Sequence, residues 1–501
     1  MRMVAALFAG LLALQGPAGG WRATPEEIRR TPKWMIEAAD RPADTNEVAV
    51  ADEPRGLKLF LLIGQSNMSG RGCVGAKDAR PMARCLKLNR HGKWVAASSP
   101  VHFDRASCGY GPANSFVRAY LAEHPEDTVG LVPCAVGGSL SVTWSPEDAP
   151  DPVGTNFRRA LARVRTAQKN GRVAGILWHQ GESDIGFFAK DPDLKERYSE
   201  RLAEMVRVFR AELGCPDAPF LVGEIGTLPK DRTRMNPILA EAVRRIPNAG
   251  LAKASDLTGH MPDNIHFDTP SYEVLGVRYY DAWKRLTGAT SGTRGILDVL
   301  SGGDLSSFRC PMAEAGEIGL TFALTNGILV ANAKRALVLE SPRDCDFRDF
   351  VLAADVRYES EGFADSGIQF CVTHPNGGTA RSGIEYQLKT GAIGDGWALP
   401  GVSISRCGGQ TASTNHEGYA CLPRLKDSKW KAGGWHRVSV IKRGSHVQFF
   451  FDGEQVNEFV AEGLKAGKIG FQTKPYPEGC GSVSFRNVKL YDIGISSGKA
   501  K

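Results

Sequence analysis

The sequence lacks the features that mark several specialised classes of protein. After its first 20 residues it has no apolar run long enough to cross a membrane. Its net charge is only +7 over 501 residues, and no block of lysine and arginine stands out. We therefore expect no membrane insertion, no nucleic-acid binding and no attachment to a charged membrane surface.

Metal-binding signatures are also missing. Neither a paired CxxC spacing nor an HExxH motif occurs, which argues against a structural zinc and a zinc protease. We expect no metal ion and no cofactor. The chain has 11 cysteines, an odd number that leaves at least one unpaired in a monomer. Cys73 and Cys85 flank a short basic loop that a disulfide could close, although the sequence does not determine the pairing.

The N-terminus has the pattern of a secretory signal peptide. Arg2 precedes an apolar stretch at 3–14, and small residues follow at 18–20. This stretch is too short to span a bilayer, so we expect cleavage near Gly20 and a secreted or periplasmic protein. Disulfides are permitted in that environment. A buried first helix is the alternative, but the position and flanks favour export.

The rest of the chain divides into two regions by pattern. After an irregular lead-in at 21–56, residues 57–290 alternate strands with amphipathic helices. We expect strands near 59–63, 128–135, 173–178, 220–225 and 250–255, and helices near 112–123, 156–168, 194–213, 236–245 and 272–286. This alternation predicts an α/β domain with a parallel sheet covered on both faces.

A second domain of different type follows. Residues 291–304 are rich in glycine, serine and threonine and read as a linker. From 305 to 495 short alternating runs dominate, and the Asp452-Gly453 pair between two of them is a hairpin signal. We predict an all-β sandwich or jelly roll.

Chemically suggestive residues follow three predicted strands and precede the last helix. The segments are Gly64-Gln65-Ser66-Asn67, Gly137-Gly138, His179-Gln180-Gly181-Glu182 and Asp263-Asn264-Ile265-His266. Because the carboxyl ends of parallel strands meet at one edge of a sheet, all four segments could converge there.

Together these residues are the set that acyl transfer needs. Ser66 would attack an ester, His266 would take its proton, and Asp263 would orient the imidazole. The backbone N–H groups of Ser66 and Gly138 and the amide of Gln180 would bind the oxyanion. Met68 stands where a GxSxG motif has its second glycine, which disfavours the α/β-hydrolase fold.

Each residue also has a purely structural explanation. Ser66 and the glycine pair suit ordinary turns, Gln180 and Glu182 suit a helix cap, and Asp263 suits an Asx-turn. Residue type does not separate the six histidines of this region, at 91, 102, 124, 179, 260 and 266. Asp256, Asp268 and Glu182 are alternatives to Asp263 as the orienting acid.

At these motifs the sequence resembles the SGNH-type hydrolases, especially carbohydrate esterase family 6, the acetyl xylan esterases, with sialate O-acetylesterases as relatives. The matching stretches are GQSNMSGRG (64–72), GLVPCAVGGS (130–139), WHQGESD (178–184) and DNIHFD (263–268). The resemblance implies a flavodoxin-like α/β/α sandwich and a metal-free serine esterase acting on acetylated glycans. It assigns the roles given above to Ser66, Asp263, His266, Gly138 and Gln180, and family 6 shares Gln180 where other SGNH enzymes have Asn.

Further residues are candidates for substrate contact. Asn67 and Glu182 lie within the motifs, and Trp144 follows the glycine pair, where it would line the acyl or sugar pocket. For Trp144 a position in the core is an equally good interpretation.

The C-terminal region resembles the 3-keto-disaccharide hydrolase family, a concanavalin-like jelly roll. The resemblance rests on stretches such as DFVLAADVRY (349–358), GIEYQLK (383–389) and GGWHRVSVIKRG (433–444). Glu385, Gln387, Trp397 and Trp435 are candidates for sugar contact, although a structural role on the strands is the favoured interpretation. We expect a carbohydrate acetylesterase. The alternatives are a two-site glycan processor, with a second hydrolytic site in this domain, and a glycan-binding protein with an inert esterase half.

Overall fold

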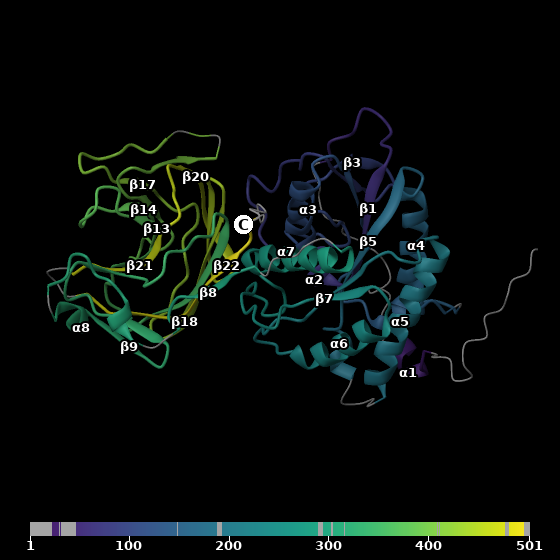
Figure 1. The fold of residues 1–501 in the computed structure, drawn as a ribbon. Coiled ribbons are helices and arrows are strands. Elements are labelled where there is room, and N and C mark those ends of the chain that lie inside the picture. Colours follow the sequence, from purple (N-terminus) through teal and green to yellow (C-terminus); the bar gives the residue numbers. More distant parts are fainter. Residues whose placement is uncertain are drawn as a thin grey trace, which may run out of the picture.

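The computed structural model describes residues 23–29, 31, 47–147, 149–187, 193–288, 294–301, 304–314, 316–407, 409, 411–475 and 480–494. The predicted signal peptide lies outside these residues. Figure 1 shows an α/β domain beside an all-β domain, which confirms the predicted fold class. Within the described ranges, no helix has both the length and the apolar character needed to cross a membrane.

A seven-stranded sheet forms the centre of the α/β domain, in the order β3-β2-β4-β1-β5-β6-β7. All neighbours are parallel except β2 and β3, an edge hairpin that sequence analysis did not anticipate. Strands β4-β1-β5-β6-β7 have the flavodoxin-like order, with its switch point at β1. The strands are β1 Leu57–Gly64, β2 Cys85–Leu88, β3 Trp94–Ala96, β4 Val129–Pro133, β5 Gly171–His179, β6 Phe220–Gly223 and β7 Ala249–Ala252.

Helices cover both faces of this sheet. Alternate residues of β1 pack into two cores, since Phe60 and Leu62 join one cluster, whereas Leu59 and Leu61 join the other. The first cluster includes α3 and α7, and the second includes α4, α5 and α6. The helices are α1 Pro25–Arg29, α2 Ser66–Ser69, α3 Pro112–Glu123, α4 Thr155–Ala167, α5 Leu194–Glu212, α6 Asn236–Arg245 and α7 Thr269–Leu286, with short 3₁₀ turns at Ser141–Trp144, Asp184–Phe187 and Thr233–Met235.

Two antiparallel sheets form the C-terminal sandwich. The larger has the order β16-β20-β19-β18-β12-β22-β10-β9, with β8 also paired to β22, and the smaller has the order β11-β21-β13-β14-β15-β17. Its helical turns are Leu305–Ser307 and α8 Glu317–Thr321. Its strands are β8 Ile296–Asp298, β9 Phe322–Thr325, β10 Ile328–Ala331, β11 Leu337–Glu340, β12 Phe350–Tyr358, β13 Ser366–Thr373, β14 Ser382–Gln387, β15 Gly396–Ala398, β16 Ser403–Arg406, β17 Ala420–Leu422, β18 Trp435–Arg443, β19 His446–Phe451, β20 Glu454–Glu462, β21 Lys468–Thr473 and β22 Val483–Asp492.

Two sequence-based expectations are corrected here. Strand β8 lies inside the segment predicted to be a linker, because its backbone extends the sheet alongside β22. All 11 cysteines are free thiols, so Cys73 and Cys85 do not form the disulfide that their positions in the sequence would allow. Cys85 is buried on β2, whereas the Cys73 thiol lies 3.5 Å from the carbonyl oxygen of Gly453 in the sandwich.

The two domains pack through the outer face of the larger sheet. Strand β12 has two buried faces: Leu352 and Ala354 point into the sandwich core, while Val351 and Ala353 join the core that contains α3 and α7. Figure 1 shows α7 facing this sheet. The sandwich is therefore packed against the same helix layer that covers one face of the α/β sheet.

Candidate active site

Ser66 is placed by a turn that only glycine fits. Strand β1 ends at Gly64, which has a φ of +123°, and a side chain there would come within 2.1 Å of the carbonyl oxygen of His179 on β5. The chain then enters the one-turn helix α2, whose first residue is Ser66. Ser66 is 6% exposed at the carboxyl edge of the parallel sheet, where ligands bind in such folds.

His266 and Asp263 lie beside Ser66 in the order that a proton relay requires. The Nε2 atom of His266 is 2.8 Å from the Oγ atom of Ser66, and its Nδ1 atom is 2.5 Å from Oδ2 of Asp263. The imidazole therefore bridges hydroxyl and carboxylate. This is the geometry in which a histidine accepts a serine proton while a carboxylate fixes its tautomer.

Asp263 is held as a carboxylate by its own loop. Burial alone would raise its pKa, but hydrogen bonds from His266 and from the backbone N–H groups of Ile265 and His266 lower it. Asn264 adopts a left-handed conformation with a φ of 62°, which suits asparagine and closes this tight loop.

The three alternative acids have other partners. Asp256 forms a two-pronged ion pair with Arg278, at 2.6 and 2.8 Å. Asp268 caps α7 by accepting the backbone N–H of Ser271, and Glu182 accepts the Asn67 amide. Asp263 is thus the carboxylate that contacts His266.

The backbone N–H groups predicted to bind an oxyanion are open. The segment after β4 runs along the end of β1, with the N–H of Val136 bonded to the carbonyl of Gly64 at 3.0 Å. Gly138 has a φ of +76° in the turn that follows. Within the described residues, neither the N–H of Gly138 nor that of Ser66 donates to a protein acceptor.

The geometry does not support the predicted role of Gln180 as an oxyanion donor. Its amide nitrogen donates to the carbonyl of Ser139 at 3.0 Å and to the carboxylate of Asp184, while its oxygen accepts the hydroxyl of Tyr198. Gln180 is fully buried. Donation to a substrate would require one of these bonds to break. In this structure Gln180 instead stabilises the turn at Gly138 through its hydrogen bond to the carbonyl of Ser139.

Substrate contact by Asn67 and Trp144 is likewise not supported. Both are 1% exposed: Trp144 packs edge-on against Trp178, and Asn67 links Glu182 to the hydroxyl of Tyr272. The carboxylate of Glu182 is buried too. Desolvation opposes its ionisation, but hydrogen bonds from His179 and Asn67 lower its pKa. Through these hydrogen bonds, Asn67 connects the Ser66 segment to the segment after β5 and to α7.

Two buried carboxylates missed by sequence analysis support the Gly138 turn. Asp104 accepts the N–H of Gly137 at 2.7 Å and pairs with Arg71. Asp184 accepts the N–H of Ser141 at 3.0 Å as well as the Gln180 amide. Asp184 ends the WHQGESD motif, so a signal was present, whereas nothing in the sequence around Asp104 marks it.

A pocket of about 450 Å³ adjoins the Gly138 turn. Its wall includes Glu182 and Ser183, and its rim carries Lys230, Arg232 and Arg234 from one loop. The lining as a whole has three cations against two carboxylates, Glu182 and Asp231, so its formal charge is positive by one. Sequence analysis missed this loop, although the run KDRTR (230–234) shows the charge.

A second pocket of about 650 Å³ lies on the smaller sheet of the sandwich. Glu385, Gln387 and Trp397 line it, together with Arg381 and other polar residues. Trp435 does not line it; its ring lies on the larger sheet, 4.0 Å from the Arg486 guanidinium. Burial raises the pKa of Glu385 to about 7, despite a hydrogen bond from Gln369 that lowers it.

Two groups of described residues bring possible metal ligands within 4.8 Å of one another: Cys407 with His446 and Glu458, and His124 with Glu126 and Asp127. The Glu458 carboxylate already accepts the backbone N–H groups of Ala76 and Lys77. Neither group includes a residue of the Ser66 site.

Two protein-family models match this chain, one over the α/β domain and one over the sandwich. Residues 56–285 match the family model for carbohydrate esterase, sialic acid-specific acetylesterase, and residues 281–491 match that of the 3-keto-alpha-glucoside-1,2-lyase-like domain. A probable carbohydrate esterase of Arabidopsis thaliana is 28% identical over 251 residues, 45% of this chain and 90% of that protein.

Solved structures are similar as well. The crystal structure of an Arabidopsis thaliana protein is 25% identical, covering 46% of this chain and 98% of that one, with a TM-score of 0.38. A carbohydrate acetylesterase from Xanthomonas citri is 17% identical, covering 68% and 74%, with a TM-score of 0.36.

Proposed function

From the premise that residues 56–285 are a carbohydrate acetylesterase domain, we propose that this protein is an exported serine esterase that removes O-acetyl groups from glycans. The observation that carries the mechanism is the continuous contact from Ser66 Oγ through the His266 ring to Asp263. Export is proposed from the signal-peptide pattern of the first 20 residues.

The reaction follows from this geometry. His266 takes the Ser66 proton as Oγ attacks the acetyl carbonyl, and the N–H groups of Ser66 and Gly138 receive the developing negative charge. The protonated imidazole, stabilised by Asp263, donates this proton to the sugar oxygen as the bond between that oxygen and the acetyl carbon breaks, and the sugar leaves with a free hydroxyl. Water then repeats the sequence on the acetyl-enzyme and releases acetate.

Acetate release from an acetylated glycan or a chromogenic acetyl ester tests the assignment. Ser66→Ala should lower kcat by about 1000-fold or more, because it removes the hydroxyl that contacts Nε2 of His266. The thermal unfolding temperature should fall by no more than a few degrees, since the substitution removes one hydroxyl and its hydrogen bond to His266. Full turnover by this variant would refute the proposal.

The positive rim supports a preference for acidic glycans over neutral ones such as acetyl xylan. Lys230, Arg232 and Arg234 would attract a carboxylate on the sugar, such as that of a uronic or sialic acid. The substrate comparison is acetylated xylan against acetylated sialic acid, at low and high salt. Equal kcat/KM values for both, independent of salt, would remove this preference from the proposal.

The sandwich pocket supports a second candidate activity, cleavage of a 3-keto-glycoside. The family model matched by residues 281–491 gives the substrate class, and Glu385 is a buried acid that titrates near neutrality, as proton transfer at neutral pH requires. If this activity exists, Ser66→Ala should retain it and Glu385→Gln should lose it. Binding of sugar without turnover at either site would instead favour a glycan-binding protein.

A further inference from the structure

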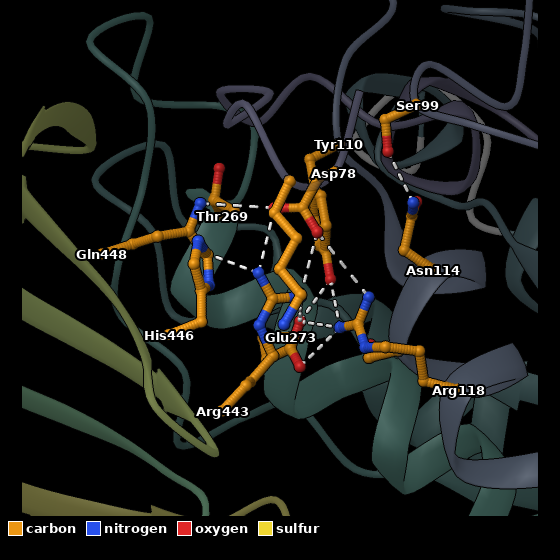
Figure 2. A network of polar contacts seen from close by, with 12 residues as sticks. Asp78, Ser99, Tyr110, Asn114, Arg118, Thr269, Glu273, Arg443, His446 and Gln448 are labelled. Carbon is orange, nitrogen blue, oxygen red and sulfur yellow. Dashed lines mark hydrogen bonds and ion pairs between the residues drawn. The ribbon is translucent and has the colours of Figure 1, made fainter. Parts of the chain in front are cut away.

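Polar contacts between the two domains are buried. Arg443 at the end of β18 forms a two-pronged ion pair with Asp78, at 2.9 and 3.0 Å, and Figure 2 shows it beside Glu273 of α7. The side chains of Asp78 and Arg443 are 4% and 11% exposed. Glu458 adds bonds to the backbone N–H groups of Ala76 and Lys77. The sandwich is therefore docked in one defined orientation.

Within this orientation, one hairpin turn of the sandwich contacts the loop that carries the Asp–His pair. The Asp452-Gly453 turn joins β19 to β20, and Gly453 has a φ of +80°. A side chain at Gly453 would lie 2.3 Å from the carbonyl oxygen of His260 and 3.2 Å from the Cα atom of Met261. The two backbones are therefore in direct contact.

The turn itself is fixed within the sandwich. Asp452 accepts the imidazole of His436 at 2.7 Å and the backbone N–H of Arg437 at 2.8 Å. The Arg437 guanidinium reaches across to the hydroxyl of Thr258 in the esterase loop, at 2.5 Å. The loop is thus held at Thr258 and at His260 by neighbouring parts of one sheet.

The backbone at these contact points is hydrogen-bonded to the segment that carries His266. His260 pairs antiparallel with Phe267, and the N–H of Met261 donates to the carbonyl of His266 at 2.8 Å. A displacement of His260 and Met261 would therefore move the His266 backbone. A shift of about 1 Å in a catalytic group is enough to slow a reaction by roughly 100-fold.

We propose that the Asp452-Gly453 turn of the β-sandwich positions His266 of the esterase, so that the second domain is a structural component of the first domain's active site. This inference rests on the proposed esterase function. Gly453 and Thr258 are positioning residues in this scheme, because they act through the backbone of the loop and do not contact the reacting atoms.

Gly453→Ala in the full-length protein is the primary test. The added methyl group meets backbone, which cannot move as a flexible side chain would, so kcat should fall at least about tenfold with KM changed by no more than about twofold. The acid limb of the pH–rate profile should also shift, because the distance between His266 and Asp263 changes. Labelling of Ser66 by a fluorophosphonate probe should slow in parallel, independently of sugar binding.

Gly444→Ala is the matched control. Gly444 lies in the neighbouring β18–β19 turn with a φ of +60°, and a side chain there meets no atom within 4 Å. It imposes similar backbone strain without the contact, so its kcat and labelling rate should equal those of the wild type. An equal loss in both variants would overturn the proposal, since strain within the sandwich would then explain it.

Thr258→Val and Thr258→Ser provide a second test if Gly453→Ala does not fold. Valine removes the hydroxyl that receives Arg437, whereas serine keeps it, so only valine should lower kcat and the labelling rate. Suppose that Ser66→Ala abolishes ester turnover, but Gly453→Ala or Thr258→Val reacts at the wild-type rate. This result would overturn the proposal that the sandwich positions His266, while the proposed esterase function would still hold. A wild-type protein without ester turnover would overturn both.

Discussion

The contact between Ser66 and His266 joins side chains that are 200 positions apart. Local structure determines how each is placed: the turn at Gly64 positions Ser66 at the end of β1, and hydrogen bonds within the loop hold Asp263 beside the imidazole. The side chain of Asp263 is 45% exposed, whereas that of His266 is 16% exposed. The proposed orienting acid therefore lies at the rim of the site, with partial access of water.

Asp263→Asn tests the orienting role at this scale. An amide cannot hold the Nδ1–H tautomer or stabilise an imidazolium, so kcat should fall by about 100-fold or more at neutral pH. Steady-state hydrolysis of an acetyl ester measures this loss. Asp256→Asn is the matched control, because Asp256 pairs with Arg278 and should leave kcat within about threefold of wild type.

At the scale of elements, the loop that carries Asp263 and His266 leads directly into α7. Asp268 is the N-cap of this helix: its carboxylate accepts the N–H of Ser271 at 2.8 Å, and the residue is 1% exposed. The same helix carries Glu273 to the domain interface. Helix α7 thus connects the loop that carries Asp263 and His266, at its start, to the sandwich along its length.

Asp268→Ala should cost stability more than activity. Loss of a buried N-cap lowers the free energy of unfolding by about 1–2 kcal/mol, because one helix N–H is left without its acceptor. Urea or thermal unfolding measures the change. Asp268→Asn is the control, since asparagine caps helices equally well and should retain most of the stability. A loss of turnover as large as that of Asp263→Asn would contradict the assignment of Asp263 as the orienting acid.

At the scale of the molecule, buried charges join the domains. Burial opposes ionisation of Asp78, but its pairing with Arg443 lowers its pKa to about 2. A carboxylate whose pKa is lowered by folding stabilises the folded state above its ordinary pKa. That stabilisation is lost as the pH falls from about 4 towards 2. The interface is therefore acid-sensitive in this range.

Asp78→Asn should remove this acid sensitivity and weaken the protein at neutral pH. Breaking a buried pair leaves Arg443 without its full partner, which costs about 3 kcal/mol or more. The slope of unfolding free energy between pH 4 and pH 2 should flatten. Asp151→Asn is the control, because the Asp151–Arg158 pair is exposed and contributes no more than about 1 kcal/mol.

Sequence reasoning succeeded where a local pattern carries the information. The continuous apolar run at 59–63 predicted strand β1, and the predicted helix at 112–123 coincides with α3. Sequence reasoning left two interpretations of Trp144 open, and it did not anticipate the buried hydrogen-bond partners of Gln180, because burial and partners depend on tertiary packing. Asp104 was missed because its partner, the N–H of Gly137, is distant in sequence and carries no side-chain signal.

The sequence alone determined the two fold types and the set of chemical groups available to the esterase, because periodicity and motif residues are local properties. Only the tertiary structure decided which acid faces His266, because four nearby carboxylates differ in their partners rather than in their chemistry. It alone also placed Gly453 against His260, since packing between two domains brings together backbones that no sequence spacing relates.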